Sequence, residues 1–216
     1  SQDVGRAGVS GPWYPGCARC GAKGSYTPIS PLTDWKVRCR QCGEVFPKND
    51  FIRFYVSGLD ERGIFRRSRS RADARLLFNV EYPDPSHPLH RFAVDDGTGW
   101  VDAEGKRHFF TAIVADQLWG LLLGALQNLA RAYLLSGEKR YAHKALLLLY
   151  RFADLYPEMD FDPYARLGAI HNHGGSGQGR IFGRISECGV ASGCSEAYDM
   201  VRDAVDGDPE LLNFLS

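Results

Sequence analysis

The chain has no excess of charge of either sign. Among its 216 residues, 26 Lys and Arg balance 26 Asp and Glu, and 44% of the residues are hydrophobic. A disordered chain needs low hydrophobicity and high net charge, so the composition excludes that class and predicts a globular protein with a buried core. The length suits one large domain or two small ones. The neutral balance argues against a nucleic-acid partner, although a local basic patch is compatible with it.

The chain also lacks a long hydrophobic run. A membrane-spanning helix needs about 18 apolar residues in succession. The longest candidate, 113–135, is interrupted by polar and charged residues: Asp116, Gln117, Gln127, Asn128 and Arg131. We therefore expect no membrane partner. No signal peptide is visible, and the chain begins at Ser1 without Met, which indicates a processed, trimmed or partial product.

The chain has six cysteines, and four of them are grouped. They form two CxxC pairs with 18 residues between the pairs: Cys17, Cys20, Cys39 and Cys42. Paired CxxC motifs about 15–20 residues apart are typical of a tetrahedral metal site. Glycine follows each pair, at Gly21 and Gly43, and permits the tight turn that directs two thiolates toward one ion.

We expect zinc at these four cysteines, in a structural role, because four thiolates leave no open position for water or substrate. The alternatives are a catalytic zinc, a nucleic-acid-binding ribbon, or two disulfides in place of the metal. The other two cysteines, Cys188 and Cys194, are six residues apart, which does not suit a metal pair. We expect them to be buried thiols.

The first region of the chain, residues 1–50, is rich in Gly, Pro and Ser and has no helical period. It predicts a small β-ribbon built around the metal, with residues 35–39 as one short strand.

The second region, residues 51–110, is predicted to be irregular because prolines interrupt it. Turn clusters at 95–99 and 103–105 flank Trp100, which indicates one strand of a small hairpin. The carboxylates of the first turn are expected to accept hydrogen bonds from turn amides, with Trp100 packed against the helices that follow. A short helix is expected around 72–77.

The third region, residues 111–216, is predicted to be helical. Apolar residues recur at helical spacing over 111–135 and 139–156, and Gly137 and Pro157 mark the ends of the two helices. The short link makes them an antiparallel hairpin. The first helix is expected to be buried on more than one side, because four residues widen its apolar stripe: Leu121, Ala125, Ala132 and Leu135.

Two further helices are expected, one over 195–205 and a short one that begins at Pro209. Two other features could contact a polymer, the first through charge and the second by stacking on sugar rings. The stretch 62–75 carries six arginines, for which a solvated loop is the equal alternative. Trp119, on the first long helix near Gln117, is the aromatic residue that we place nearest a groove, and buried packing is the alternative for the aromatic residues.

The loop 171–180 concentrates polar side chains on a glycine-rich connection. Its donors are His171, Asn172, His173, Gln178 and Arg180. The two histidines could act as an acid and base pair, or could hold a carboxylate together with the arginine. The alternative is a surface turn with incidental histidines.

Four stretches together resemble the heparinase II/III-like polysaccharide lyases, in the branch that carries a cysteine ribbon. They are 39–51 (CRQCGEVFPKNDF), 54–61 (FYVSGLDE), 94–100 (VDDGTGW) and 130–142 (ARAYLLSGEKRYA). The resemblance implies a toroid of antiparallel helix hairpins followed by β-sandwich domains. It also implies cleavage of uronic-acid polysaccharides by β-elimination, and a secreted or periplasmic location.

With this resemblance the expected fold class is mainly α. The N-terminal region would be partly irregular and partly β, in the form of a zinc ribbon. Antiparallel helix hairpins of an incomplete (α/α) toroid would follow it. The chain would be the N-terminal portion of the lyase. Its partners would be an acidic polysaccharide, such as a glycosaminoglycan or alginate, and the rest of the same polypeptide.

The resemblance also suggests roles for the polar residues. Asn172 and His173 are the candidates for catalysis in this chain, unless the catalytic pair follows Ser216. The candidates for substrate binding are His171, Gln178, Arg180, Trp119 and Gln117. The rival interpretation is a non-catalytic module, in which a zinc ribbon and a helical scaffold bind glycan or protein.

Overall fold

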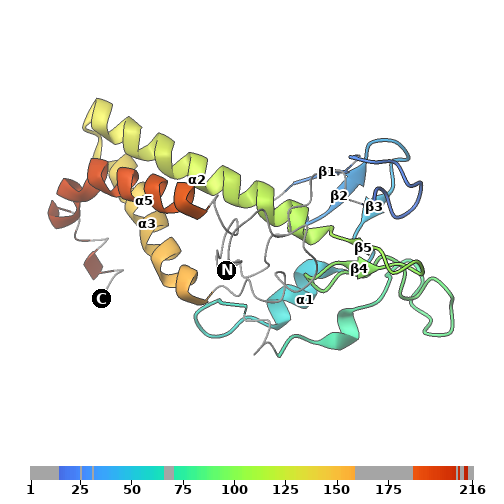
Figure 1. Cartoon of the computed structure of the whole chain (residues 1–216). Coiled ribbons are helices and arrows are strands. Elements are labelled where there is room, and N and C mark those ends of the chain that lie inside the picture. Colours follow the sequence, from blue (N-terminus) through green and yellow to red (C-terminus); the bar gives the residue numbers. More distant parts are fainter. Residues whose placement is uncertain are drawn as a thin grey trace.

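A computed structural model of the chain describes residues 15–24, 26–30, 32–65, 71–158, 187–207, 209 and 212–213. Within these ranges it contains four α-helices, a three-stranded sheet and a two-stranded sheet. The sheets and one short helix lie at one end of the molecule and the other helices extend away from them (Figure 1). No described helix combines the length and the apolar character that crossing a bilayer requires.

The three-stranded sheet is antiparallel and formed by β1 (Tyr26–Pro28), β2 (Val37–Cys39) and β3 (Val45–Phe46), in that order. The central strand β2 covers the last three residues of the strand predicted at 35–39. Val37 and Cys39 are buried whereas Arg38 between them is exposed, the alternation expected of a strand with one covered face. The small N-terminal sheet that the sequence predicted is therefore confirmed.

The second region is less irregular than predicted, because it contains helix α1 (Phe51–Ser57). The Asp50 side chain caps this helix by accepting a hydrogen bond of 3.0 Å from the backbone N–H of Arg53. Its aromatic face packs on Trp35, whose ring stacks on Tyr55 with 5.9 Å between centroids. Where a helix was expected around 72–77, the structure has the single 3-10 turn η2 (Ala74–Leu76).

A β-hairpin ends the second region. Strands β4 (Trp100–Val101) and β5 (Arg107–His108) pair antiparallel, with Trp100 opposite His108. The turn between them is closed by Asp102, whose Oδ1 accepts hydrogen bonds from the backbone N–H groups of Glu104 and Lys106, at 2.9 and 2.8 Å. The hairpin agrees with the strand predicted at Trp100.

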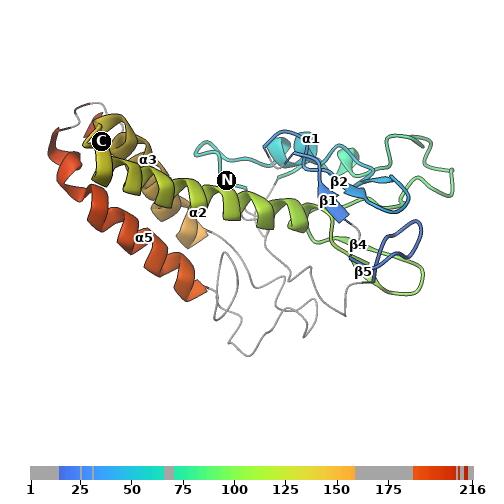
Figure 2. The same cartoon turned by 90° about the horizontal axis from the view of Figure 1, so that it is seen from above.

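Two long helices follow, as the apolar periodicity predicted. Helix α2 (Thr111–Ser136) ends at Gly137, which adopts the left-handed conformation with φ 69° and donates its N–H to the carbonyl of Tyr133. Helix α3 (Lys139–Leu155) begins directly afterwards and runs back from the distal end of α2 (Figures 1 and 2). A 3-10 turn, η3 (Tyr156–Glu158), ends it at the predicted proline.

Helix α5 (Glu187–Val201) lies alongside α2 in both views and continues into the 3-10 segment η6 (Arg202–Gly207). The sequence predicted this helix over 195–205, so its start was placed too late. The early part contains Gly189 and Gly193, and each glycine lowers helix propensity by about 1 kcal/mol relative to alanine. Pro209, Leu212 and Asn213 are helical, but most of the predicted terminal helix lies outside the described residues.

The buried side chains form two apolar clusters. The ribbon cluster joins the three-stranded sheet, α1 and the first turns of α2, and the helix cluster joins the rest of α2 with α3 and α5. Helix α2 belongs to both, because Leu118 lies in the ribbon cluster and Trp119 lies in the helix cluster. Its other face is open: Leu121 is 50% exposed and Leu135 is 87% exposed. The expectation that these leucines are buried is wrong for the described part of the chain.

Asp95 connects the loop region to α2. Its side chain is fully buried, and Oδ1 accepts hydrogen bonds from the N–H groups of Gly97 and Gly99, at 2.7 and 2.8 Å. Asn49 exchanges two hydrogen bonds of 2.9 Å with the Asp95 backbone. Burial raises the pKa of the Asp95 carboxyl, and the backbone donors of Thr111, Gly99 and Gly97 act in the opposite direction. The turn at 95–99 is thus held by its carboxylate, as predicted.

Candidate metal centre

The four paired cysteines converge at one end of the three-stranded sheet. Their Sγ atoms all lie within 4.8 Å of one another. Cys17 and Cys42 have a sulfur separation of 3.8 Å, and Cys20 and Cys39 have the same separation. All four are free thiols, with no disulfide between them.

Two matching turns position these sulfur atoms, and we call them the first knuckle (residues 17–22) and the second knuckle (residues 39–44). In the first, the Cys17 N–H donates to the carbonyl of Ala22 at 2.9 Å and Gly21 N–H donates to the carbonyl of Cys17 at 2.8 Å. In the second, the equivalent bonds measure 2.8 and 2.9 Å. Gly21 and Gly43 have φ values of 73° and 76°, so glycine is the residue that closes each turn without strain.

The sulfur spacing fits a tetrahedral metal ion. A typical Zn–S distance of about 2.3 Å places neighbouring sulfur atoms of a tetrahedron about 3.8 Å apart, which equals the separation of both cross-knuckle pairs. A disulfide requires about 2.05 Å. Donor set, geometry and spacing therefore all suit a four-thiolate metal centre.

Burial differs within the set. Cys17 and Cys39 are 3% and 0% exposed, whereas Cys20 and Cys42 are exposed. Burial raises the pKa of the Cys17 thiol to about 12. A thiol with this pKa keeps its proton at neutral pH unless a cation displaces it, so metal binding at this centre would release protons.

Tyr26 fastens the first knuckle to the ribbon cluster. Its hydroxyl accepts a hydrogen bond of 2.8 Å from the Ala18 N–H, inside the knuckle. Its ring meets the edges of Phe46 and Phe110, with centroid distances of 5.6 and 5.7 Å. Burial raises the pKa of the Tyr26 phenol, which therefore stays neutral.

His108 connects the β4–β5 hairpin to the residue directly before the first knuckle. Its Nδ1 lies 3.2 Å from the carbonyl of Gly16, and its Nε2 lies 2.9 Å from the Asp102 carboxylate. Both partners are hydrogen-bond acceptors, so the ring links the hairpin turn to the chain that enters the first knuckle. Partial burial acts to raise the pKa of Asp102, but the bonds from His108 and from two turn amides outweigh it and hold this pKa below its usual range.

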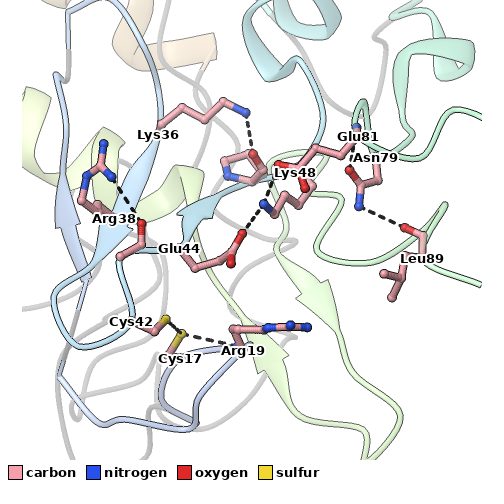
Figure 3. A network of polar contacts seen from close by, with 12 residues as sticks. Cys17, Arg19, Lys36, Arg38, Cys42, Glu44, Lys48, Asn79, Glu81 and Leu89 are labelled. Atoms are coloured by element: carbon pink, nitrogen blue, oxygen red, sulfur yellow. Dashed lines mark hydrogen bonds and ion pairs between the residues drawn. The ribbon is translucent and has the colours of Figure 1, made fainter.

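Lys48 fastens the second knuckle (Figure 3). This lysine is 6% exposed, and its Nζ atom bonds to the carboxylate of Glu44 in the knuckle and, at 2.7 Å, to that of Glu81. Burial lowers the pKa of Lys48, but the two carboxylates outweigh this and raise it overall. Ion pairs of a buried lysine therefore connect the second knuckle to the loop that contains Glu81, whose side chain is more exposed.

The other histidines of this region make ordinary hydrogen bonds. His90 Nδ1 donates to the carbonyl of Tyr82 at 3.0 Å, and His87 Nδ1 accepts from the N–H of Leu89 at 3.2 Å. Among the described residues, the four cysteines are the one group of three or more side chains that could hold a metal ion.

The structure separates the two predicted substrate residues of α2. Trp119 is 1% exposed and packs against Phe152, with 5.1 Å between ring centroids. It is a core residue, because the large indole fills the space between α2 and α3 instead of facing a groove. Gln117 is exposed, and two residues correspond to a rotation of about 200° around a helix. The two side chains therefore do not line one surface.

The predicted polar loop lies outside the described residues. This applies to both catalytic candidates and to the remaining substrate-binding candidates: His171, Asn172, His173, Gln178 and Arg180. Their roles remain predictions.

Part of the arginine-rich stretch forms internal ion pairs. Arg62 contacts Glu158 at 3.2 Å and also pairs with Asp154. Arg151, on α3, donates to the carbonyl of Arg62 at 3.1 Å. These contacts join the loop after α1 to the end of α3, so Arg62 is engaged within the protein.

An apolar groove of about 880 Å³ lies between α3 and α5. Phe152, Tyr156 and Tyr198 contribute aromatic rings to its lining, and both remaining cysteines border it. Cys188 is exposed and Cys194 is half-buried. The prediction that both are buried thiols is therefore wrong for Cys188, and burial raises the pKa of the Cys194 thiol.

Comparison of the chain with protein-family models, curated proteins and solved structures found no match. The resemblance to a lyase family accordingly depends on the four sequence stretches quoted above.

Proposed function

We propose that this chain is the zinc-stabilised N-terminal portion of a polysaccharide lyase that acts on uronic-acid glycans. The observation that carries the proposal is the connection between the stretches that bear the family resemblance. The first, 39–51, contains the second knuckle and Asn49, and Asn49 bonds to Asp95 in the stretch 94–100. The stretch 130–142 forms the link between α2 and α3, and α2 begins at the amides that Asp95 caps.

Zinc is the metal that this proposal places at the four cysteines. Thiolate ligands in a tetrahedral set favour zinc, and a four-thiolate site is closed to substrate. When bound, zinc would cross-link the two knuckles. It would take no part in the β-elimination reaction. Cys17, Cys20, Cys39 and Cys42 would hold it.

The three long helices would begin an (α/α) toroid. In this proposal, the open face of α2 with Leu121 and Leu135 is where further helices of the same polypeptide pack. Burying one leucine side chain contributes about 1.5–3 kcal/mol, which would favour such packing. An enzyme that degrades polymeric glycans meets them outside the cell, so the location would be secreted or periplasmic.

The elimination would need three groups. Donors must neutralise the uronate carboxylate, a base must remove the neighbouring proton, and an acid must protonate the leaving oxygen. The proposal assigns carboxylate binding to Arg180 with His171 and Gln178, and catalysis to Asn172 and His173. Trp119 is not assigned a substrate contact, because it is buried.

The test uses the full-length protein and the chain 1–216 with several uronate polymers, and follows the absorbance of the new C=C bond. We expect activity in the full-length enzyme. Replacing His171 and His173 with Ala should raise KM, and should also lower kcat if either ring takes part in proton transfer. His143→Ala, on α3, is the matched control. Absence of eliminated product with every polymer would exclude the lyase proposal.

The second candidate function is a non-catalytic module that binds glycan or protein. The four-thiolate centre favours it, because such a metal site holds a scaffold together and leaves no open position for a substrate. Binding of uronate oligosaccharides by the full-length protein without any eliminated product would select this alternative.

A further inference from the structure

We infer that the four clustered cysteines are also a modification site for peroxides, which convert them into two disulfides, Cys17–Cys42 and Cys20–Cys39. Each disulfide would join the first knuckle to the second. The inference depends on the geometry of the cysteine cluster and is independent of the proposed glycan chemistry.

The two pairs share one arrangement. Each consists of an exposed cysteine and a buried one: Cys42 faces solvent while Cys17 is 3% exposed, and Cys20 faces solvent while Cys39 is 0% exposed. Within each pair the sulfur atoms lie 3.8 Å apart. A soluble oxidant therefore meets Cys20 and Cys42 first, and each has a buried thiol of the other knuckle within reach.

The chemistry balances with hydrogen peroxide as the oxidant. An exposed thiolate attacks the peroxide, which breaks the O–O bond and gives a sulfenic acid and hydroxide. The sulfur of the buried partner then attacks the sulfenic sulfur, the S–S bond forms, and the hydroxyl group takes up a proton from the partner thiol or from solvent and leaves as water. Two peroxide molecules accept four electrons from the four sulfur atoms, and the metal ion is released. Each pair must close by about 1.8 Å to reach a disulfide distance of about 2.05 Å.

The choice of cysteine pairs determines whether the two knuckles stay connected after the metal is released. Disulfides within each CxxC motif would close each knuckle on itself and leave the two knuckles without a connection. Cross-knuckle disulfides would replace the metal as the link between them. Cys39 lies in β2 opposite Tyr26, so the link would keep the sheet and the Tyr26 contact in place. The ribbon could then persist in an oxidising compartment after it loses its metal.

Trypsin permits a direct test, because Arg19 and Arg40 lie inside the two CxxC motifs. Cleavage after these residues and after Lys23, Arg38 and Lys48 places each of the four cysteines on a separate peptide. The zinc-loaded chain is treated with hydrogen peroxide, alkylated and digested without reduction. Disulfide-linked peptides are identified by mass spectrometry, and released zinc is measured with a chromogenic chelator.

We expect release of zinc together with two linked products, 7–19 with 41–48 and 20–23 with 39–40. Cys188 and Cys194 should remain alkylated, as internal controls for unpaired thiols. In Cys20→Ser, the Cys17–Cys42 product should persist and Cys39 should become alkylated. Pairs within a CxxC motif, or sulfinic acids at Cys20 and Cys42 without disulfides, would overturn the inference. So would oxidised protein that unfolds at the same temperature as chelated, reduced protein.

Discussion

Asp95 caps α2 from a distant turn: its Oδ2 atom lies 3.0 Å from both the backbone nitrogen and the hydroxyl oxygen of Thr111. The helix starts at Thr111, and the residue before it, Phe110, has no side chain that could cap. A buried carboxylate from 16 residues upstream therefore satisfies the first amides of the helix. The same carboxylate holds the turn at 95–99, so one side chain joins the loop region to the helical region.

Asp95→Asn should reduce the free energy of unfolding by about 2–4 kcal/mol. An amide keeps one acceptor oxygen, so either the turn amides or the helix amides lose their acceptor, at about 1–3 kcal/mol for each unsatisfied buried group. Asp96→Asn is the matched control, since that carboxylate bonds to Thr98 within its own turn, and it should cost about 1 kcal/mol or less. Equal losses in denaturant titrations of the two variants would contradict the capping role.

Cys39→Ser should abolish stoichiometric zinc binding and lower stability by at least about 3 kcal/mol, because metal-binding energy contributes to folding. For a chain of this size that corresponds to a fall in Tm of about 6–12 °C. Cys194→Ser should retain the metal. The measurements are elemental analysis and thermal unfolding of protein purified under reducing conditions with zinc supplied. Wild-type protein that contains no zinc under these conditions would refute the metal centre.

Two glycines with similar backbone conformations should differ in their tolerance of alanine. Gly99 and Gly105 have φ values of 84° and 79°. A Cβ at Gly99 would lie 2.6 Å from the backbone oxygen of His108, whereas one at Gly105 would have nothing within 4 Å. Gly105→Ala should cost about 1–2 kcal/mol for the left-handed conformation alone. Gly99→Ala should cost at least about 1–2 kcal/mol more, because backbone of the hairpin must move. Equal unfolding free energies in the two variants would be inconsistent with this hairpin packing.

The pair of Asp102 and His108 should make stability depend on acidity. The pKa of Asp102 is lower in the folded protein than its ordinary value of about 3.9, so its contribution to stability is fully present above that value. The contribution is lost as pH falls through the lower, folded pKa. Between about pH 5 and pH 3, Asp102→Asn should therefore lose less stability than the wild type. Glu104→Gln, in the same turn, should follow the wild-type curve, and parallel curves for all three proteins would contradict the prediction.

The parts of the fold that local patterns encode could be predicted from the sequence. The α2–α3 hairpin has long apolar periods and a glycine at its link, and the four cysteines have the spacing of a metal site. Helix α1 was missed because its seven residues are too few to establish a period, and its stability comes from packing on Trp35. The early turns of α5 were missed because Gly189 and Gly193 weaken the local helix signal.

The supports of the metal centre could not be predicted, because they connect distant parts of the chain. His108 bonds to Gly16, 92 positions earlier, and Lys48 bonds to Glu81, 33 positions later. No local pattern encodes such pairs, which depend on how the hairpin and the loop pack on the sheet. The prediction that Trp119 lies near a groove failed for a related reason. Its position in the sequence suits either a groove or a core, and the packing of Phe152 against it places it in the core.

The passage of α2 through both clusters has a consequence for how this chain can change in length. Each residue turns a helix by about 100°, so one residue inserted between Leu118 and Leu126 would rotate the whole helix cluster about the axis relative to the ribbon cluster. Buried faces on one side of the insertion would then point to solvent. An insertion of seven residues restores the helical phase to within about 20°. Related chains that vary in length are therefore expected to do so in their loops, or in α2 by units of two turns.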